Sequence, residues 1–133
     1  MKYMLMMHAP RAGWEKAGIG TWAPEEIKAH INFMHRLNNE LKEAGELVDA
    51  QGLALPEAAR VVRAGKGGTP EVTDGPFAEA KEFLAGFWIV DCESTERAYE
   101  IAARASAAPG PGGAPMNMPI EVRQVMSAPP ADV

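Results

Sequence analysis

The stretch FLAGFWIVDC, residues 83–92, gives the strongest strand signal in the 133-residue chain. A second apolar run, KYMLMM at residues 2–7, is too short for a helix and also predicts a strand. Side chains alternate along a strand, so Phe83 and Phe87 are expected on one face and Trp88 on the other. Both faces of both strands are therefore apolar, which is typical of the two central strands of a sheet.

The segments around these strands predict two helices and further strands. Pro24 and Glu25 start a helix, because proline suits the first turn and a carboxylate favours the positive end of the helix dipole. Gly45 ends that helix, and Ser94 is a suitable N-cap for a second helix at residues 95–107. The other expected elements are strands at residues 47–55 and 120–126 and a small hairpin of residues 60–64 and 71–73. This order predicts an α+β fold, a ferredoxin-like split βαβ antiparallel sheet with an inserted hairpin.

Two helices cover only one face of such a sheet, so the apolar second face needs another cover. A second copy of the chain, packed sheet to sheet in a homodimer, provides one. The alternative is that the loop at residues 9–23, which carries Trp14 and Trp22, folds back over this face.

Composition bounds the class of protein. The length predicts one domain over residues 1–126 and a flexible C-terminal tail at residues 127–133. Thirteen basic and eighteen acidic residues give a net charge of -5, which argues against binding to nucleic acid. The apolar run at residues 3–7 is too short for a secretion signal or a membrane span, so we expect a cytoplasmic protein without a membrane partner. The single cysteine, Cys92, excludes an internal disulfide.

His30 is one candidate site residue. At about 100° per residue it lies roughly 40° from Met34, inside the apolar stripe of the first helix, and is expected to point toward the sheet. Histidine changes protonation near neutral pH and suits acid–base catalysis. The alternative is a core histidine bonded to a backbone carbonyl. We predict no metal and no cofactor, because His30 and His35 are poorly spaced for chelation and no zinc or phosphate-binding motif is present.

The segment DGPFAEAKE, residues 74–82, is a turn that has two interpretations. Asp74 is favoured at the first position of a turn, and Gly75 relieves the steric restriction that Pro76 imposes on the preceding residue. The segment is either a rigid turn whose Phe77 fills the core or a turn that holds the Asp74 carboxylate at the mouth of a cleft. Elsewhere, His8 ends the first strand and can line a cleft, and Met116 and Met118 are candidates for an adaptable apolar lid.

Residues 74–82, followed by Leu84 and residues 86–90, resemble the DGPF signature of the YCII-related family. The segments MKYML at residues 1–5, PEE at 24–26 and IEVR at 120–123 are also similar, so the likeness covers nearly the whole chain. The resemblance implies a ferredoxin-like homodimer of the dimeric α/β-barrel type. It also implies either an enzyme in which a histidine and an aspartate meet in a cleft, or a regulatory partner of a sigma factor of the extracytoplasmic-function type.

Three functional hypotheses follow. The first is a small cofactor-independent enzyme in which His30 and Asp74 move a proton on a small organic molecule. Its substrate-binding residues are predicted to be His8, Gly75, Pro76, Phe77 and Trp88. The second is a non-catalytic ligand-binding or regulatory module that pairs with a sigma factor. The third is a relative of dimeric ferredoxin-like oxygenases, with Trp88 near an aromatic substrate. The fold alone does not choose among them.

Overall fold

The computed structural model describes residues 1–126, apart from the side chain of Glu15, so the tail predicted at residues 127–133 lies outside the described residues. Within residues 1–126, no helix is both long and apolar enough to cross a lipid bilayer. The elements are β1 (Lys2–Pro10), α1 (Trp14–Ala17), α2 (Pro24–Glu43), β2 (Leu47–Gly52), β3 (Arg60–Ala64), β4 (Pro70–Asp74), β5 (Glu82–Asp91), α3 (Thr95–Ser106) and β6 (Ile120–Gln124). Short 3-10 turns lie at Ile19–Thr21, Pro56–Ala58, Lys66–Gly68 and Pro111–Gly113.

Four strands form an antiparallel sheet in the order β2-β5-β1-β6, while β3 and β4 form a separate hairpin. Helix α2 connects β1 to β2 across β5, and α3 connects β5 to β6 across β1, an arrangement compatible with the ferredoxin-like split βαβ pattern. The predicted α+β class, the antiparallel sheet and the inserted hairpin are therefore confirmed. Within residues 1–126 the sheet stays open and does not close into a barrel.

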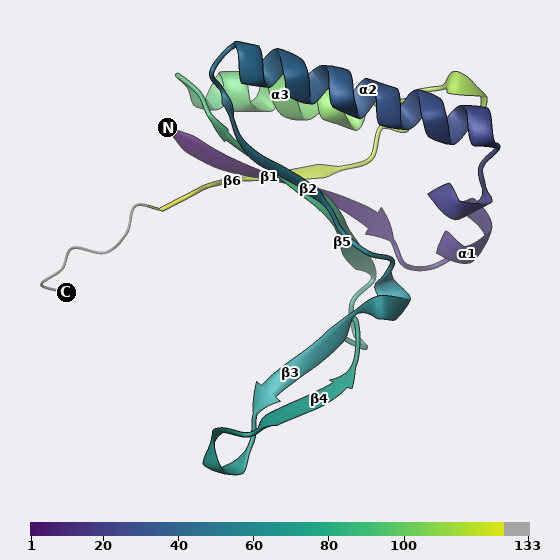
Figure 1. Ribbon diagram of the computed structural model, residues 1–133, viewed down its shortest axis with the longest axis vertical. Coiled ribbons are helices and arrows are strands. Elements are labelled where there is room, and N and C mark those ends of the chain that lie inside the picture. The colour runs from purple at the N-terminus through teal and green to yellow at the C-terminus, as the bar shows by residue number, and fades with distance from the viewer. Residues whose placement is uncertain (127–133) are drawn as a thin grey trace, which may run out of the picture.

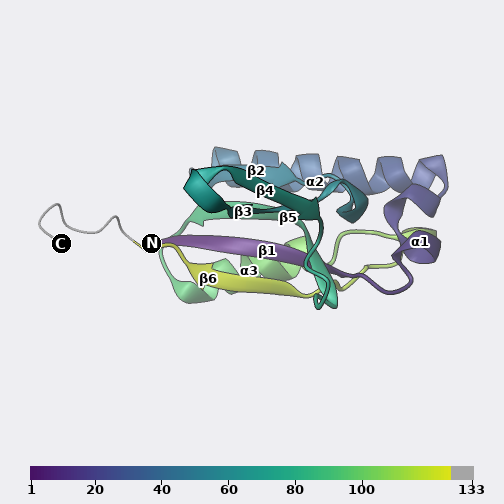
Figure 2. The same cartoon turned by 90° about the horizontal axis from the view of Figure 1, so that it is seen from below.

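Both long helices lie on the same side of the sheet, and the β3–β4 hairpin projects from the opposite side, as Figure 1 shows. Figure 2, the view from below, places the strands in front of the helices. A crossover between parallel strands is almost always right-handed, so two such crossovers in one split βαβ sheet bring both helices to one face. The other face carries no helix of the described chain.

The ends of α2 follow the sequence signals. Pro24 occupies the first turn, and the Glu26 carboxylate accepts a hydrogen bond of 2.9 Å from the backbone amide of Ala23. Gly45 has a φ of 74°, and the next amide, that of Glu46, donates back to a carbonyl of the last turn at 2.8 Å. The helix therefore ends where glycine is needed, as predicted.

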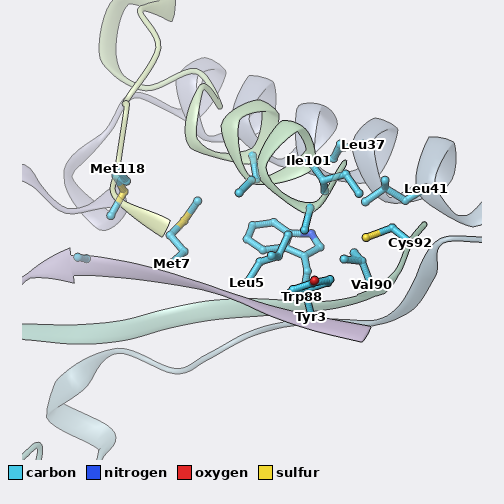
Figure 3. Packing of buried hydrophobic residues seen from close by; sticks show 14 of the residues in the cluster. Tyr3, Leu5, Met7, Leu37, Leu41, Trp88, Val90, Cys92, Ile101 and Met118 are labelled. Atoms are coloured by element: carbon cyan, nitrogen blue, oxygen red, sulfur yellow. The ribbon is translucent and has the colours of Figure 1, made fainter. Parts of the chain in front are cut away.

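The core fills the space between the helices and the sheet (Figure 3). Its fully buried large side chains come from both layers: Leu5, Leu37, Leu41, Val90 and Ile101. Helix α3 presents mainly small residues to the sheet, because Ala98, Ala102 and Ala105 are buried beside Ile101. Small side chains let the α3 backbone approach the strands, and the larger leucines of α2 fill the remaining space.

A β-bulge in β5 overturns one detail of the predicted face pattern. Met7 pairs with Gly86 and His8 with Leu84, so Ala85 is the extra residue in the ladder. The extra residue reverses the alternation, and Phe83 is buried in the core together with Trp88 instead of sharing a face with Phe87. Strand periodicity alone does not predict a bulge, which explains the error.

The two loop tryptophans pack on the helix side of the sheet. The Trp14 ring meets Phe83 edge-on at a centroid distance of 4.9 Å, and Trp22 meets His30 at 5.5 Å. The prediction that their loop covers the other face is wrong, because these contacts hold both rings against the core and α2. We call that other surface, centred on Met4, Met6, Phe87 and Ile89, the helix-free face; these four residues are half-buried in one chain.

An ion pair links the end of α2 to the start of α3. Arg97 donates from Nε and Nη2 to the two carboxylate oxygens of Glu46 at 2.9 and 2.8 Å. The Ser94 hydroxyl caps the same helix by accepting from the Arg97 amide at 3.1 Å, as predicted for this N-cap. The guanidinium holds the pKa of Glu46 below its ordinary value. This pair therefore stabilises the fold only while Glu46 is ionised.

We predict that Glu46→Gln lowers the free energy of unfolding at pH 7 by about 1–3 kcal/mol, as expected for charge-assisted hydrogen bonds. Because the Glu46 pKa is lower in the folded than in the unfolded chain, the stabilisation is fully present above the unfolded value, about 4.3, and is lost as pH falls through the folded value. Urea unfolding of the wild type and the variant between pH 7 and pH 2 measures this. The gap between them should shrink steadily below about pH 4.

The matched control is Glu100→Gln, since Glu100 also contacts Arg97, at 3.1 Å, but its side chain is 66% exposed. We expect this control to cost about 0.5 kcal/mol or less. Equal losses for the two variants, or a Glu46→Gln gap that persists at pH 2, would contradict the assignment.

Candidate functional site

A cavity of about 460 Å³ lies between α2 and the sheet, at the edge formed by β2 and β5. Its size falls within the range of small-molecule sites, roughly 300–1,000 Å³. The walls are mostly apolar, and the polar side chains among the lining residues are His30, His35, Asn38 and Gln51, with Trp indole groups beside them. An apolar cavity with few polar groups is the usual form of a site for a small organic molecule.

Aromatic and sulfur-containing side chains dominate the cavity wall. All three tryptophans of the chain, Trp14, Trp22 and Trp88, line it. Four methionines also line it: Met7, Met34, Met116 and Met118. Tryptophan offers a large flat surface, and methionine adapts its unbranched side chain to irregular shapes. These walls therefore favour a flat or elongated apolar ligand.

His30 projects from α2 into the cavity wall with a fixed orientation. Its Nδ1 atom donates to the backbone carbonyl of Pro109 at 3.0 Å, because a carbonyl oxygen accepts and cannot donate. In the neutral imidazole the proton therefore sits on Nδ1, and Nε2 carries the free lone pair. No residue of the described part of the chain bonds to Nε2. The sequence left two interpretations of His30 open, a site residue and a histidine bonded to a backbone carbonyl. In the structure both descriptions apply to His30.

The loop at residues 108–119, which we call the Pro/Gly loop, closes one side of the cavity with Met116 and Met118. Glu26 binds this loop to α2, since its carboxylate accepts from the Gly112 amide at 2.6 Å. That hydrogen bond is the main cause that holds the pKa of Glu26 below its ordinary value. The contacts from Glu26 and His30 fix the loop against the first turns of α2.

Asn38 lies on the cavity wall and is oriented by Trp88. The Trp88 indole Nε1 donates to Asn38 Oδ1 at 2.8 Å. Because an indole nitrogen only donates, the amide oxygen must face it, and the amide nitrogen Nδ2 faces elsewhere. Asn38 therefore presents an N–H donor whose direction the Trp88 contact fixes.

Asp74 is the last residue of β4 and pairs with Arg60, the first residue of β3, so it lies at the base of the β3–β4 hairpin. Its side chain is 96% exposed, and its nearest cation is Arg60, whose Nε lies 3.7 Å from Oδ1. Asp74 does not line the cavity, so within residues 1–126 the structure does not bring it to His30. The residue that bonds to His30 Nδ1 is Pro109, through its backbone carbonyl.

The rest of the DGPF turn also lies outside the cavity wall. Gly75, Pro76 and Phe77 are absent from its lining within the described residues. Phe77 is 66% exposed, so the interpretation that it fills the core is wrong for one chain. Arg11 stabilises the turn through hydrogen bonds to its backbone. Its Nη1 atom donates to the carbonyls of Phe77, at 3.0 Å, Ala78 and Ala80.

His8 belongs to a second hollow, which lies where the end of β1 meets the starts of β5 and β6. Its Nε2 atom lies 3.0 Å from Glu121 Oε1, and Lys81 and Glu82 line the same hollow. Of the predicted substrate-binding residues, Trp88 alone shares the cavity with His30. Within residues 1–126, no group of three His, Cys, Asp or Glu side chains is arranged to hold a metal ion.

The lining residues that sequence reasoning missed include Asn38, Trp14 and Trp22. A signal for Asn38 existed, because it follows Met34 by four residues and so lies about 40° from it, inside the apolar stripe on the side opposite His30. The two tryptophans carried no such signal. Their position depends on the irregular segment between β1 and α2, whose path periodicity does not describe.

Comparison with known proteins identifies the family of the chain. A sequence model of the YCII-related domain matches residues 1–114. An uncharacterized protein of Rhizobium meliloti (strain 1021) is 33% identical over 97 residues, which are 73% of this chain and 77% of that protein. The family match covers most of the four-stranded sheet, both long helices and nearly all of the cavity wall. The chain therefore belongs to the YCII-related family.

Proposed function

We propose that this chain binds a small organic molecule in the cavity under α2 and that His30 transfers a proton to or from it without a cofactor. The observation that carries the proposal is the hydrogen bond from His30 Nδ1 to the Pro109 carbonyl, 3.0 Å long, on a residue that lines a cavity of about 460 Å³. It leaves Nε2 as the ring atom available to a ligand.

The proposed chemistry uses both ring nitrogens. Neutral Nε2 accepts a proton from the ligand, for example from a hydroxyl or from a C–H beside a carbonyl. The imidazolium that forms keeps its Nδ1–H bond to the Pro109 carbonyl, whose negative end stabilises the new charge. The reverse step returns the proton to another atom of the same ligand. This sequence is an isomerisation, in which one proton leaves one atom of the ligand and returns to another, and it balances without an oxidant.

Within one chain Asp74 takes no part in this proton transfer, because it does not line the cavity. In one chain its hairpin projects away from the layer of helices that covers the cavity (Figure 1). We also propose that the chain belongs to the DGPF subgroup of the family, because the turn at residues 74–82 resembles the signature of that subgroup.

We predict that His30→Gln abolishes proton transfer and leaves binding in place. A thermal-shift screen of small carbonyl compounds and phenols identifies binders, since a ligand of the native state raises the Tm. Incorporation of solvent deuterium into a binder, followed by NMR, then measures proton transfer. The variant should lose this exchange by about a hundredfold or more, the usual contribution of a general acid–base group.

His8→Gln is the matched control, because His8 lies in the other hollow and does not line the cavity. Its exchange rate should equal that of the wild type. Exchange by His30→Gln at the wild-type rate would overturn the proposed role of His30.

We also propose that two copies pair through the helix-free face. Met4 pairs with Ile89 and Met6 with Phe87 across the central strands, which gives one apolar stripe. The stripe lies between charged residues of the edge strands, such as Glu121 on β6 and Asp49 on β2. An apolar centre with a polar rim is the usual composition of a subunit interface.

Exposed apolar side chains on the β3–β4 hairpin also favour a second copy of the chain as the partner. Val62 and Val72 face each other across β3 and β4, and they are 59% and 58% exposed. The hairpin projects from the helix-free side of the sheet, so in a sheet-to-sheet pair it would extend along the second copy (Figure 1). Contact with a second copy would remove these apolar side chains from water.

We predict that light scattering gives the wild type a molar mass of twice the 14.3 kDa of one chain. Ile89→Lys should convert it to a monomer, because the lysine would place an unpaired charge in the interface. Tyr99→Lys is the control, since Tyr99 is 57% exposed on α3, on the other side of the molecule. A wild-type particle of 14.3 kDa would overturn the homodimer and favour a different protein partner for this face, as in the regulatory hypothesis.

A further inference from the structure

The cavity wall contains no side chain with a permanent charge among the described residues. Its lining includes histidines, an asparagine and a glutamine, but no Lys, Arg, Asp or Glu. An ammonium group that enters such a site gives up water and gains no opposite charge, and a carboxylate gains one only when His30 or His35 carries a second proton. The wall therefore selects against charged ligands.

One polar side chain on the wall, Asn38, has its amide orientation fixed by a neighbouring residue. Asn38 Oδ1 is occupied by the Trp88 indole, and within residues 1–126 the amide nitrogen Nδ2 makes no hydrogen bond. No buried side-chain nitrogen or oxygen of the described chain lacks a partner, so Nδ2 is accessible and not enclosed. An accessible amide N–H on a cavity wall donates to an acceptor on the ligand, such as a carbonyl oxygen.

The helix sets the distance between this donor and His30. The two residues are eight positions apart on α2, which is about 12 Å along the helix axis. Met34 lies between them and lines the cavity. A ligand that reaches both ends is thus elongated, with an apolar middle against the methionine and the tryptophans.

We infer that the cavity is specific for an uncharged, elongated and mostly apolar molecule whose carbonyl oxygen accepts a hydrogen bond from Asn38 Nδ2. Trp88 is the positioning residue that turns the amide toward the ligand. The inference rests on the cavity of the proposed function and names its ligand class, but it does not require His30 to transfer a proton.

The test compares three two-ring probes by quenching of tryptophan fluorescence at pH 7. The probes are 2-acetyl-6-hydroxynaphthalene, its carboxylate analogue 6-hydroxy-2-naphthoate, and 2-naphthol, which lacks the carbonyl group. The signal is specific because all three tryptophans of the chain line the cavity. In the wild type the ketone should bind at least about tenfold more tightly than the carboxylate and more tightly than 2-naphthol. Equal or tighter binding of the carboxylate would overturn the inference, as would no binding of the ketone.

Asn38→Asp tests the amide directly. The aspartate keeps an oxygen for the Trp88 indole but replaces the N–H donor by a second acceptor. We expect the ketone to bind at least about tenfold more weakly, while 2-naphthol loses less affinity. Asn39→Asp is the matched control, since it adds the same charge at the neighbouring exposed position. Unchanged ketone binding by Asn38→Asp would overturn the inference.

The two proposals fail in different ways. The proposed role of His30 fails if His30→Gln exchanges deuterium at the wild-type rate. That result would leave the order of the probe affinities unchanged. Failure of the specificity appears in the probe affinities alone. The comparison of ketone and carboxylate in the wild type does not depend on the folding of any variant.

Discussion

The packing of both long helices on one face of the sheet is the constraint from which the other features follow. Two crossovers of the same hand leave β5 and β1 in the centre and place α2 and α3 side by side above them. The core then occupies a single layer, with Leu37 and Leu41 of α2 and Ile101 of α3 fully buried against the strands. Because both helices lie on one face, an apolar stripe is left on the helix-free face.

The cavity exists because this layer is filled unevenly along α2. Toward the end of the helix, leucines fill the space above the sheet. Toward the start, His30 and Met34 line the open volume together with Trp14 and Trp22, which come from the segment before the helix. The same end of α2 holds the Pro/Gly loop, so the cavity wall and the orientation of His30 depend on one set of contacts.

Much of the fold followed from local signals in the sequence. Both long helices begin and end where Pro24, Gly45 and Ser94 predicted, since helix ends need particular backbone conformations and hydrogen-bond acceptors. The central strands were predicted because their two apolar faces distinguish them from edge strands. The bulge at Ala85 was not predicted, because an extra residue in a ladder leaves no mark in the local pattern.

The candidate site was predicted in part. The apolar stripe of α2 placed His30 toward the sheet, because helix periodicity fixes the direction of a side chain. Trp88 was suggested by the likeness to dimeric ferredoxin-like oxygenases. The partner of His30, the donor at Asn38 and the separation of Asp74 from the cavity depend on contacts between residues far apart in the chain. Residues 30 and 109, for example, meet only after α3 and the Pro/Gly loop have packed. The sequence by itself thus determined the elements and their apolar faces, whereas the tertiary structure decided which polar groups share a cavity, because that depends on how loops without periodicity cross the folded layers.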